Sequence, residues 1–407
     1  MLKEIMLSEE LFHTAGGVAY ADFITGGHRE SWPIRGKQFR IWLRRCYYQA
    51  TGAAASSAAI AAALDLLEAR AQFDSPERTV SIRVAEHADC IYLDLADEHW
   101  RAVEIGADGW RVLERPPVRF RRAPGMLPLP VPERGGSIEA LRSFLNLSSQ
   151  NDFILVVAWL LAALRPTGPY PLLTISGEQG SAKTFLSKLL RASVDPNVAA
   201  VRALPRDERE LMIAASNGHV LAFDNLSGLS PWLSDALCRL ASGGSFAVRR
   251  LYTNDEEVLF KAARPTLLNG IKDVIGRSDL ADRAIFLALG PIAEEQRRSE
   301  TELWRKFELA RPRILGALLD AAGTRLTSCG FHSSHCAAAH GRLRALGNGL
   351  RNRPLARGHF YARLRSQLQG RDRGEDRRRP DRRLRARAHE RAQLLDGQRR
   401  RSSADRR

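Results

Sequence analysis

The chain has 407 residues, of which 44% are hydrophobic and 27% charged, a composition typical of globular proteins with two or three domains. No apolar stretch reaches the roughly 18–20 residues of a membrane span, and the first residues lack the apolar core of a signal peptide. The five cysteines are scattered and odd in number, which argues against a disulfide framework. We therefore expect a cytoplasmic protein that does not bind membranes.

The net charge of +16 comes entirely from the C-terminal tail, residues 323–407, which holds 23 Arg and 7 acidic residues. Residues 1–322 contain 39 basic and 39 acidic residues and are neutral. Three interpretations of this Arg-rich, low-complexity tail are open: a disordered nucleic-acid-binding arm, a solvated tail without a task, or translation of a GC-rich gene in a shifted frame. We favour the third, which the coding DNA would decide.

The same tail carries cysteine and histidine side chains, the residue types that bind zinc. Their spacing is not one of the usual zinc-site spacings, so we favour an accidental cluster. The residues concerned are Cys329, His332, His335, Cys336 and His340.

Residues 1–123 are predicted to form a small α+β domain with a DNA-binding or accessory role. A strand signal at 18–24 precedes two helices, the first with its apolar residues on one face and the second capped by Ser56 or Ser57. Alternating apolar residues at 80–84 and 91–95 predict strands, and a hairpin is predicted over 100–113. The first helix also carries Lys37, Arg40 and Arg44; a solvated face is favoured there over a DNA-reading one.

A Pro/Gly-rich linker is predicted at 124–136, which holds four prolines and three glycines. Beyond it, residues 137–322 form the second predicted domain. Ser137 is expected to cap a helix, and the apolar run 153–164 to form a buried one.

The strongest motif follows an apolar strand at 172–176. Glycines at 177 and 180 permit backbone angles that point successive N–H groups inward, and the helix after them adds its positive N-terminal end. Lys183 can reach phosphates and the Thr184 hydroxyl can bind Mg²⁺, as a Walker A motif requires. Ala182 stands where Gly usually precedes the lysine, and it costs little if that position has helical angles. The predicted cofactor-binding residues are Gly177, Glu178, Gln179, Gly180, Ser181, Ala182, Lys183, Thr184 and Phe185.

Three later segments support this motif. A second apolar strand ends in Asp224-Asn225, 40 residues after Thr184, where an Asp can orient magnesium. A third ends in Asn269, which can bind the γ-phosphate or the attacking water. Two arginines then follow at a helix–strand junction, Arg277 and Arg283, each a candidate arginine finger or a structural ion-pair partner of Asp279 or Asp282.

Taken together, GEQGSAKT, HVLAFDN, RPTLLNG and RSDLADRAIFL resemble the superfamily three helicases and related AAA+ ATPases, most closely the ATPase half of phage- and plasmid-type primase–helicases of bacterial mobile elements. The likeness covers about residues 137–322. It implies an α/β P-loop NTPase core with a parallel sheet, ATP and Mg²⁺ as cofactors, homo-oligomeric rings, and action on DNA, in particular single-stranded DNA, with a primase or other replication protein as partner.

By position, the resemblance assigns phosphate and metal to Lys183 and Thr184, metal to Asp224, the sensor role to Asn269, and the finger to Arg277 or Arg283. It also implies a DNA-gripping hairpin between the second and third strands. In this chain the hairpin would span 246–261, with Arg249, Arg250 and Lys261 as candidate phosphate contacts; an ordinary surface hairpin is equally open.

Two departures from the family pattern matter. Asn225 stands where many ATPases have a catalytic Glu, and an amide cannot take a proton at neutral pH; Glu178 is a weak substitute. Residues 1–123 also lack the paired carboxylates of a primase. We expect an ATPase that drives DNA unwinding or remodelling, with a small-molecule P-loop kinase or a non-hydrolysing nucleotide- and DNA-binding module as alternatives.

Overall fold

The computed structural model describes residues 10–249, 257–271 and 274–328; for residues 246–261 and 325–328 it gives at most the backbone. Residues 323–328, predicted as the start of the Arg-rich tail, continue the last helix; the rest of the tail, with its cysteine and histidine cluster, lies outside the described residues. Among the described helices, none combines the length and apolar character needed to cross a membrane.

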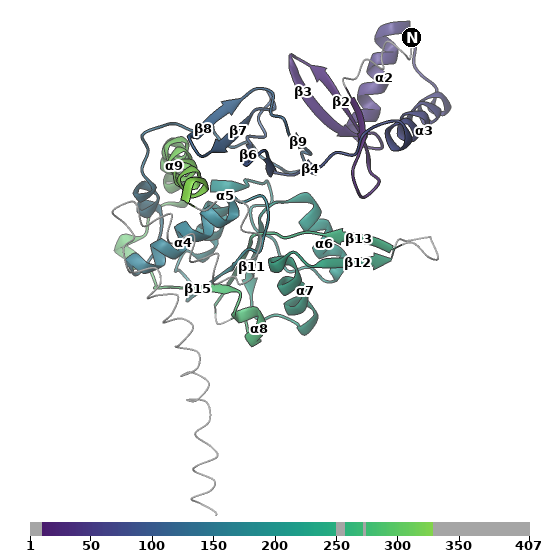
Figure 1. Ribbon diagram of the computed structural model, residues 1–407. Helices are drawn as coiled ribbons and strands as arrows, with labels where there is room; N and C mark the ends of the chain where they lie inside the picture. The colour runs from purple at the N-terminus through teal and green to yellow at the C-terminus, as the bar shows by residue number, and fades with distance from the viewer. Residues whose placement is uncertain (1–9, 250–256, 272–273, 329–407) are drawn as a thin grey trace, which may run out of the picture. The chain divides into compact units, whose positions relative to one another are not determined.

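The N-terminal part begins with a three-stranded antiparallel sheet and two helices (Figure 1). Helix α2 presents Phe39 and Leu43, and helix α3 presents Ile60, Leu64 and Leu67, to one apolar core. The Ser56 hydroxyl caps α3 by accepting from the Ala59 N–H, which confirms this helix start. The elements are β1 (Glu10–His13), β2 (Ala19–Thr25), β3 (His28–Pro33), α2 (Lys37–Thr51) and α3 (Ser57–Phe73).

A second, four-stranded antiparallel sheet follows, in the order β5-β6-β7-β8. Its last two strands form the hairpin predicted from the sequence, turning at 106–109. The strand expected over 80–84 is interrupted, because Ile82 and Arg83 separate two short strands and Arg83 turns inward. The elements are β4 (Val80–Ser81), β5 (Val84–His87), β6 (Cys90–Asp94), β7 (Ala102–Gly106), β8 (Gly109–Leu113) and β9 (Arg119–Phe120), which pairs with β4.

Residues 124–136 contain no helix or strand, yet their backbone is held on several sides. The N–H of Leu127 donates to Pro196, that of Leu129 to Leu95, and that of Glu133 to Pro312. The segment predicted as a linker therefore passes between parts of the chain in hydrogen-bonded contact with them.

The following region is a mixed α/β unit around a parallel sheet of order β11-β14-β10-β15. Helix α5 packs against β10, β11 and β14, and α4 packs against α5 (Figure 1). Helices α6 and α7 share a separate apolar core with β11 and β14. The elements are η1 (Ile138–Phe144), α4 (Gln150–Ala163), β10 (Leu172–Gly177), α5 (Lys183–Val194), α6 (Glu208–Asn217), β11 (Leu221–Leu226), α7 (Pro231–Ser242), β14 (Thr266–Gly270), α8 (Ser278–Ala281) and β15 (Ala284–Leu289).

Helix α4 is the buried helix that the apolar run predicted. Every residue from Asp152 to Ala163 is buried, and the Trp159 indole N–H donates to the Pro171 carbonyl at 3.0 Å. A helix that is apolar on all sides requires neighbours on all sides, so α4 belongs to the interior of this unit.

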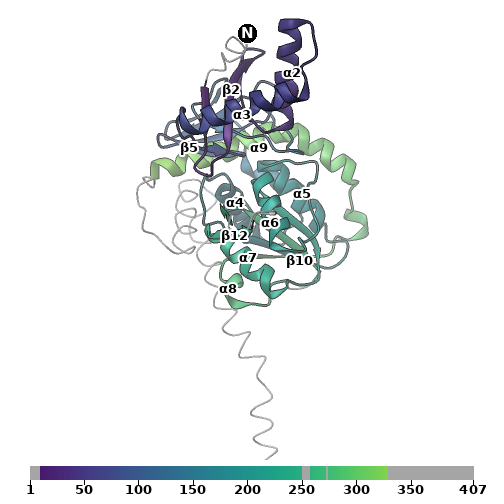
Figure 2. The ribbon, with the colours of Figure 1, turned by 90° about the vertical axis from the view of Figure 1, so that its right-hand side faces the viewer.

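Strands β12 (Ser245–Arg249) and β13 (Glu257–Lys261) pair antiparallel, which confirms the predicted hairpin. After β15, a short helix η2 (Glu294–Gln296) leads into the long helix α9 (Glu300–Ser328). Helix α9 contacts α4 and α5 (Figure 2) and also β7 and β8. Its Asp320 carboxylate accepts the Trp110 indole N–H at 3.0 Å.

Candidate functional site

The candidate site is built around the loop between β10 and α5, residues 177–182. At Gly177 the chain runs so close to its surroundings that a Cβ atom would lie 2.7 Å from both the Leu289 carbonyl oxygen and the Ser181 hydroxyl. Gly180 has a φ of +82°, a backbone angle that residues with a side chain rarely adopt. Both glycines are therefore required by the backbone path of the loop.

Ala182 departs from the expectation that it has helical angles. It caps α5 with φ 63° and ψ 30°, in the left-handed region. A residue with a Cβ costs about 1–2 kcal/mol in that conformation. The loop therefore retains the backbone form that glycine favours while carrying alanine.

Lys183, the first residue of α5, folds its ammonium group back over the loop. It donates to the carbonyl oxygens of Gly177 and Glu178, both at 2.8 Å. The buried Ser181 hydroxyl donates to the same Glu178 carbonyl at 2.8 Å. One cation thus lies directly above the glycine-rich turn, while Glu178 and Gln179 expose their side chains to solvent.

Thr184 faces the end of β11, which is separated from β10 by β14. Its hydroxyl donates to the Asp224 carboxylate at 3.1 Å. Because β10 and β11 are parallel, both residues lie at the carboxyl edge of the sheet. The structure therefore brings together a hydroxyl and a carboxylate that are 40 residues apart.

The polar residue of the third strand lies beside them. Asn269 is buried, and its side-chain oxygen accepts the Asn225 backbone N–H at 3.1 Å. Its amide nitrogen donates to the buried Ser187 hydroxyl at 3.0 Å. Asn225 has a φ of 58° at an irregularity of β11 and exposes its side chain. Ser187, which the sequence analysis missed, thus fixes the orientation of the Asn269 amide.

These groups form an arrangement suited to a phosphorylated ligand with a divalent cation. The N-terminus of α5 and the loop N–H groups favour anions, and Lys183 adds a full positive charge. The Thr184 and Asp224 oxygens are the kind of ligand that Mg²⁺ prefers. Among the described residues, no group of three or more His, Cys, Asp or Glu side chains is placed to hold a metal ion.

The two predicted finger arginines are not part of this arrangement. Arg277 pairs with Asp235 at 2.9 Å and Asp279 at 3.5 Å. Arg283 precedes β15, and its carbonyl accepts the Leu172 N–H at the start of β10. It therefore lies at the edge of the sheet opposite the loop. Neither guanidinium reaches the loop of its own chain.

A different arginine lies beside the loop. The guanidinium of Arg297 is 3.4 Å from the position that a Cβ atom on Gly180 would occupy. The segment that carries it follows β15, whose last residue, Leu289, is paired with Gly177. Sequence reasoning missed Arg297 because no motif marks it; its place three residues before the long helix was the only signal.

Two further contacts support the loop. The Asn146 side-chain amide donates to the carbonyls of Ser181 at 3.2 Å and Gly290 at 2.8 Å. On α5, the buried Phe185 ring packs edge-on against Trp304, with 5.4 Å between centroids. Phe185 thus anchors the helix that begins at the loop, and its ring is engaged with α9.

The candidate DNA contacts fall on the β12–β13 hairpin. Arg249 is the last residue of β12 and pairs with Glu257 next to the tip, whereas Lys261 is the last residue of β13 and pairs with Ser245 at the base; for both, only the backbone is described. Arg250 lies outside the described residues. The position of the hairpin between β11 and β14 in the sequence is the one that the resemblance implied.

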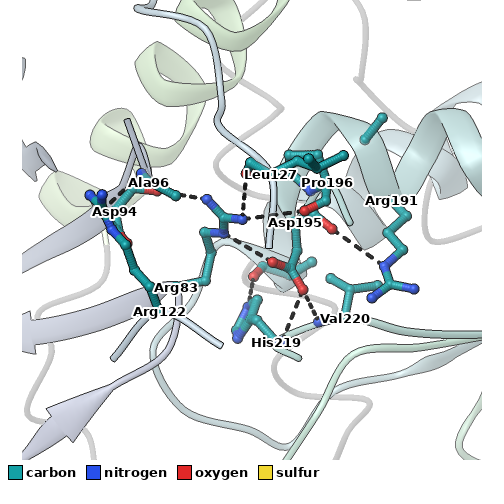
Figure 3. A network of polar contacts seen from close by, with 12 residues as sticks. Arg83, Asp94, Ala96, Arg122, Leu127, Arg191, Asp195, Pro196, His219 and Val220 are labelled. Carbon is teal, nitrogen blue, oxygen red and sulfur yellow. Dashed lines mark hydrogen bonds and ion pairs between the residues drawn. The ribbon is translucent and has the colours of Figure 1, made fainter. Parts of the chain in front are cut away.

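Behind the loop, the far end of α5 enters a buried polar network (Figure 3). Asp195 accepts from the Arg83 guanidinium and from the N–H groups of His219 and Val220, each at 2.9 Å. Arg191 donates to the Asp195 carbonyl at 3.3 Å. Burial would raise the pKa of Asp195, but the Arg83 charge and the other partners hold it below its ordinary value.

The same burial acts on the neighbouring basic groups. It lowers the pKa of His219 to about 4, so this imidazole is neutral at physiological pH. Its Nε2 lies 2.6 Å from the Ala163 carbonyl, which places the proton on Nε2. Burial also lowers the pKa of Arg191 to about 10. The groups around Asp195 are therefore the Arg83 and Arg191 guanidinium groups and a neutral imidazole, and Arg83 links them to the Asp94–Arg122 ion pair.

Comparison with known proteins supports a replication protein. Residues 138–331 match the model of a family described as actinomycete integrative conjugative element replication protein. This match covers the parallel-sheet unit and α9, and it confirms the resemblance to replication proteins of bacterial mobile elements. No curated protein matches the chain.

Solved structures with a similar chain path include the apo NrS-1 C-terminal region, with 14% identity, 78% of this chain and 68% of that chain covered, and a TM-score of 0.44. The SCCmec type IV Cch active helicase has 13% identity and a TM-score of 0.38, and the alignment covers 78% of this chain and 60% of the helicase chain. Because both TM-scores are below 0.5, the functional argument rests on the site and the family match.

Proposed function

We propose that the chain binds ATP with Mg²⁺ at the 177–184 loop and hydrolyses it to drive DNA unwinding or remodelling in the replication of a mobile element. One observation carries the proposal: the loop, Lys183, Thr184, Asp224 and Asn269 converge at the carboxyl edge of one parallel sheet. The family match of residues 138–331 supplies the replication context.

Lys183 would bind the β- and γ-phosphate oxygens. Its ammonium group is bound to two loop carbonyls, so phosphate binding exchanges these neutral acceptors for charged ones, which form stronger hydrogen bonds. Thr184 and Asp224 would hold the metal, whose charge offsets that of the phosphates. The loop glycines leave room for the ligand to approach the backbone.

Hydrolysis would rely on orientation more than on a strong base. No carboxylate follows Asp224, and the amide of Asn225 can orient a water molecule without accepting its proton. Asn269, held by Ser187, fixes the Asn225 backbone. Slow turnover, stimulated by DNA, is therefore the expected behaviour.

Positive charge around the phosphates would come from two sources. Arg297 is placed to contribute in the same chain. Arg277 or Arg283 would act only on the site of a neighbouring subunit in an oligomer. The β12–β13 hairpin, with Arg249, Arg250 and Lys261, is the proposed DNA-contacting element of this unit, with a primase or other replication protein as partner.

The test is ATP binding and turnover, with and without single-stranded DNA, for the full chain and for Lys183→Ala. Lys188→Ala is the matched control, because Lys188 lies on the same helix and pairs with Glu300 outside the loop. We expect Lys183→Ala to abolish turnover and Lys188→Ala to retain it. Equal turnover in wild type and Lys183→Ala would refute the ATPase, and transfer of phosphate to a small acceptor would identify a kinase instead.

A further inference from the structure

The exposed face of helix α2 is basic from Lys37 to Arg45. At 100° per residue, Lys37, Arg40, Arg44 and Arg45 all point away from the core, together with Ile41 and Tyr48, which are 53% and 62% exposed. The opposite face holds Phe39 and Leu43 in the core. We call the outward set the α2 basic face: Lys37, Arg40, Ile41, Arg44, Arg45 and Tyr48.

This charge is local and uncompensated. Residues 31–64 contain five cations and no acidic residue, although residues 1–322 as a whole are neutral. The fifth cation, Arg35, pairs with Asp65 and Glu68 of α3, the acids next in sequence. Among the described residues, the four cations of the α2 basic face have no ion pair.

We propose that the α2 basic face binds the phosphate backbone of DNA, as a contact surface separate from the nucleotide site and from the β12–β13 hairpin. Three of its four cations are arginines, whose guanidinium groups bind phosphate through paired hydrogen bonds. The exposed Tyr48 ring among them can stack on a base or sugar. The inference does not depend on the proposed ATPase, since α2 lies outside the matched segment 138–331.

A membrane surface fits this face less well. Interfacial helices insert an apolar face and leave the basic one in water. In α2 the apolar face is already occupied by the core of the N-terminal part. What remains exposed is charged, with a single aliphatic side chain at its centre, so phosphate contact without insertion is the chemistry that it offers.

The test uses the full chain without nucleotide and a labelled oligonucleotide, single-stranded or duplex, in fluorescence anisotropy at several salt concentrations. The variant is Arg40→Ala/Arg44→Ala, and the control is Arg209→Ala/Arg305→Ala, which removes two exposed helix arginines elsewhere. Losing two phosphate contacts should weaken binding at least about tenfold at low salt and make the slope of log K against log salt shallower by about 2. The control should change neither quantity.

Tyr48 gives a second measurement that charge alone does not explain. Tyr48→Ala should weaken binding to the single strand, whereas Tyr48→Phe should retain it, because the ring and not the hydroxyl does the stacking. Unchanged affinity and salt slope in Arg40→Ala/Arg44→Ala, or the same loss in the control, would overturn the proposal. So would binding to anionic phosphatidylserine vesicles without binding to either oligonucleotide.

Discussion

The Arg83 guanidinium donates to the Asp195 carboxylate at 2.9 Å, and neither side chain has more than 2% of its surface exposed. Arg83 follows β4 in the N-terminal part of the chain, and Asp195 ends the helix that begins at the candidate nucleotide loop. Arg83 also donates to the carbonyls of Asp94, Leu127 and Pro196, so each of its three guanidinium nitrogens has a partner. The pair therefore links the end of α5 to two other segments.

Asp195→Asn should destabilise the protein strongly. It leaves Arg83 buried without its counter-charge, and removing one partner of a buried pair costs about 3–5 kcal/mol. Urea denaturation of Asp195→Asn, of Arg83→Met and of the double variant measures the effect. We expect the double variant to lose less than the sum of the two single losses.

The control for this pair is an ion pair that is more exposed to water. Arg101 pairs with Asp97 across four residues and has 29% of its side chain exposed, and such pairs contribute about 1 kcal/mol or less. Arg101→Ala should therefore change stability only slightly. A loss in Asp195→Asn no larger than in Arg101→Ala would contradict the role given to the buried pair.

His219 should make stability fall in mild acid. The folded state keeps this imidazole neutral down to about pH 4, whereas an unfolded histidine takes up its proton near pH 6.5. The unfolded state therefore binds more protons between these values, and the free energy of unfolding falls as pH decreases from about 6.5 to 4, by an amount on the order of 3 kcal/mol. Below pH 4 both states are protonated and this contribution no longer changes.

His219→Gln should flatten that part of the pH profile, because the replacement does not titrate. His99→Gln is the matched control, since His99 is 61% exposed. Denaturant unfolding at a series of pH values gives the comparison. An equally steep loss of stability in wild type and His219→Gln would mean that another group is responsible.

The carboxyl edge of the parallel sheet was predictable from the sequence, but its detail was not. Apolar strands ending in Asp224 and Asn269 indicated convergence with Lys183 and Thr184, because carboxyl ends of parallel strands share one edge. The spatial order, with β14 between β11 and β10, has no signal in strand composition. The role of Ser187 has no signal in the sequence either, because a serine within a helix is ordinary until the fold places Asn269 beside its hydroxyl.

Arg83 shows a second kind of limit. The alternation of Val80, Ile82 and Val84 predicted one strand, yet the chain leaves the strand pattern at 82–83 and buries the arginine. A single arginine within an apolar alternation normally points to solvent. Only the distant Asp195, more than a hundred residues later, makes its burial favourable, and local pattern carries no information about such a partner.

Ala182→Gly should stabilise the loop. The left-handed backbone at Ala182 costs about 1–2 kcal/mol, and glycine removes this cost while adding about 0.4–1 kcal/mol of chain entropy to the unfolded state. The net expectation is a gain of up to about 1.6 kcal/mol, with ATP affinity equal or higher. Ala192→Gly, in the last turn of the same helix, should instead lose up to about 1 kcal/mol. Matching losses in both variants would contradict the left-handed conformation at 182.

Arg297→Ala should weaken ATP binding more than ADP binding. Its guanidinium lies 3.4 Å from the Cβ position of Gly180, and the γ-phosphate adds negative charge for it to contact. A charge-assisted hydrogen bond of about 1.5–3 kcal/mol corresponds to a loss of tenfold or more. Arg298→Ala is the control, because the adjacent guanidinium is directed to the Ser143 carbonyl. Titration of both variants with fluorescent ATP and ADP analogues separates the effects. If Arg298→Ala weakened ATP binding equally, Arg297 would act only as part of the general surface charge and not as a phosphate contact.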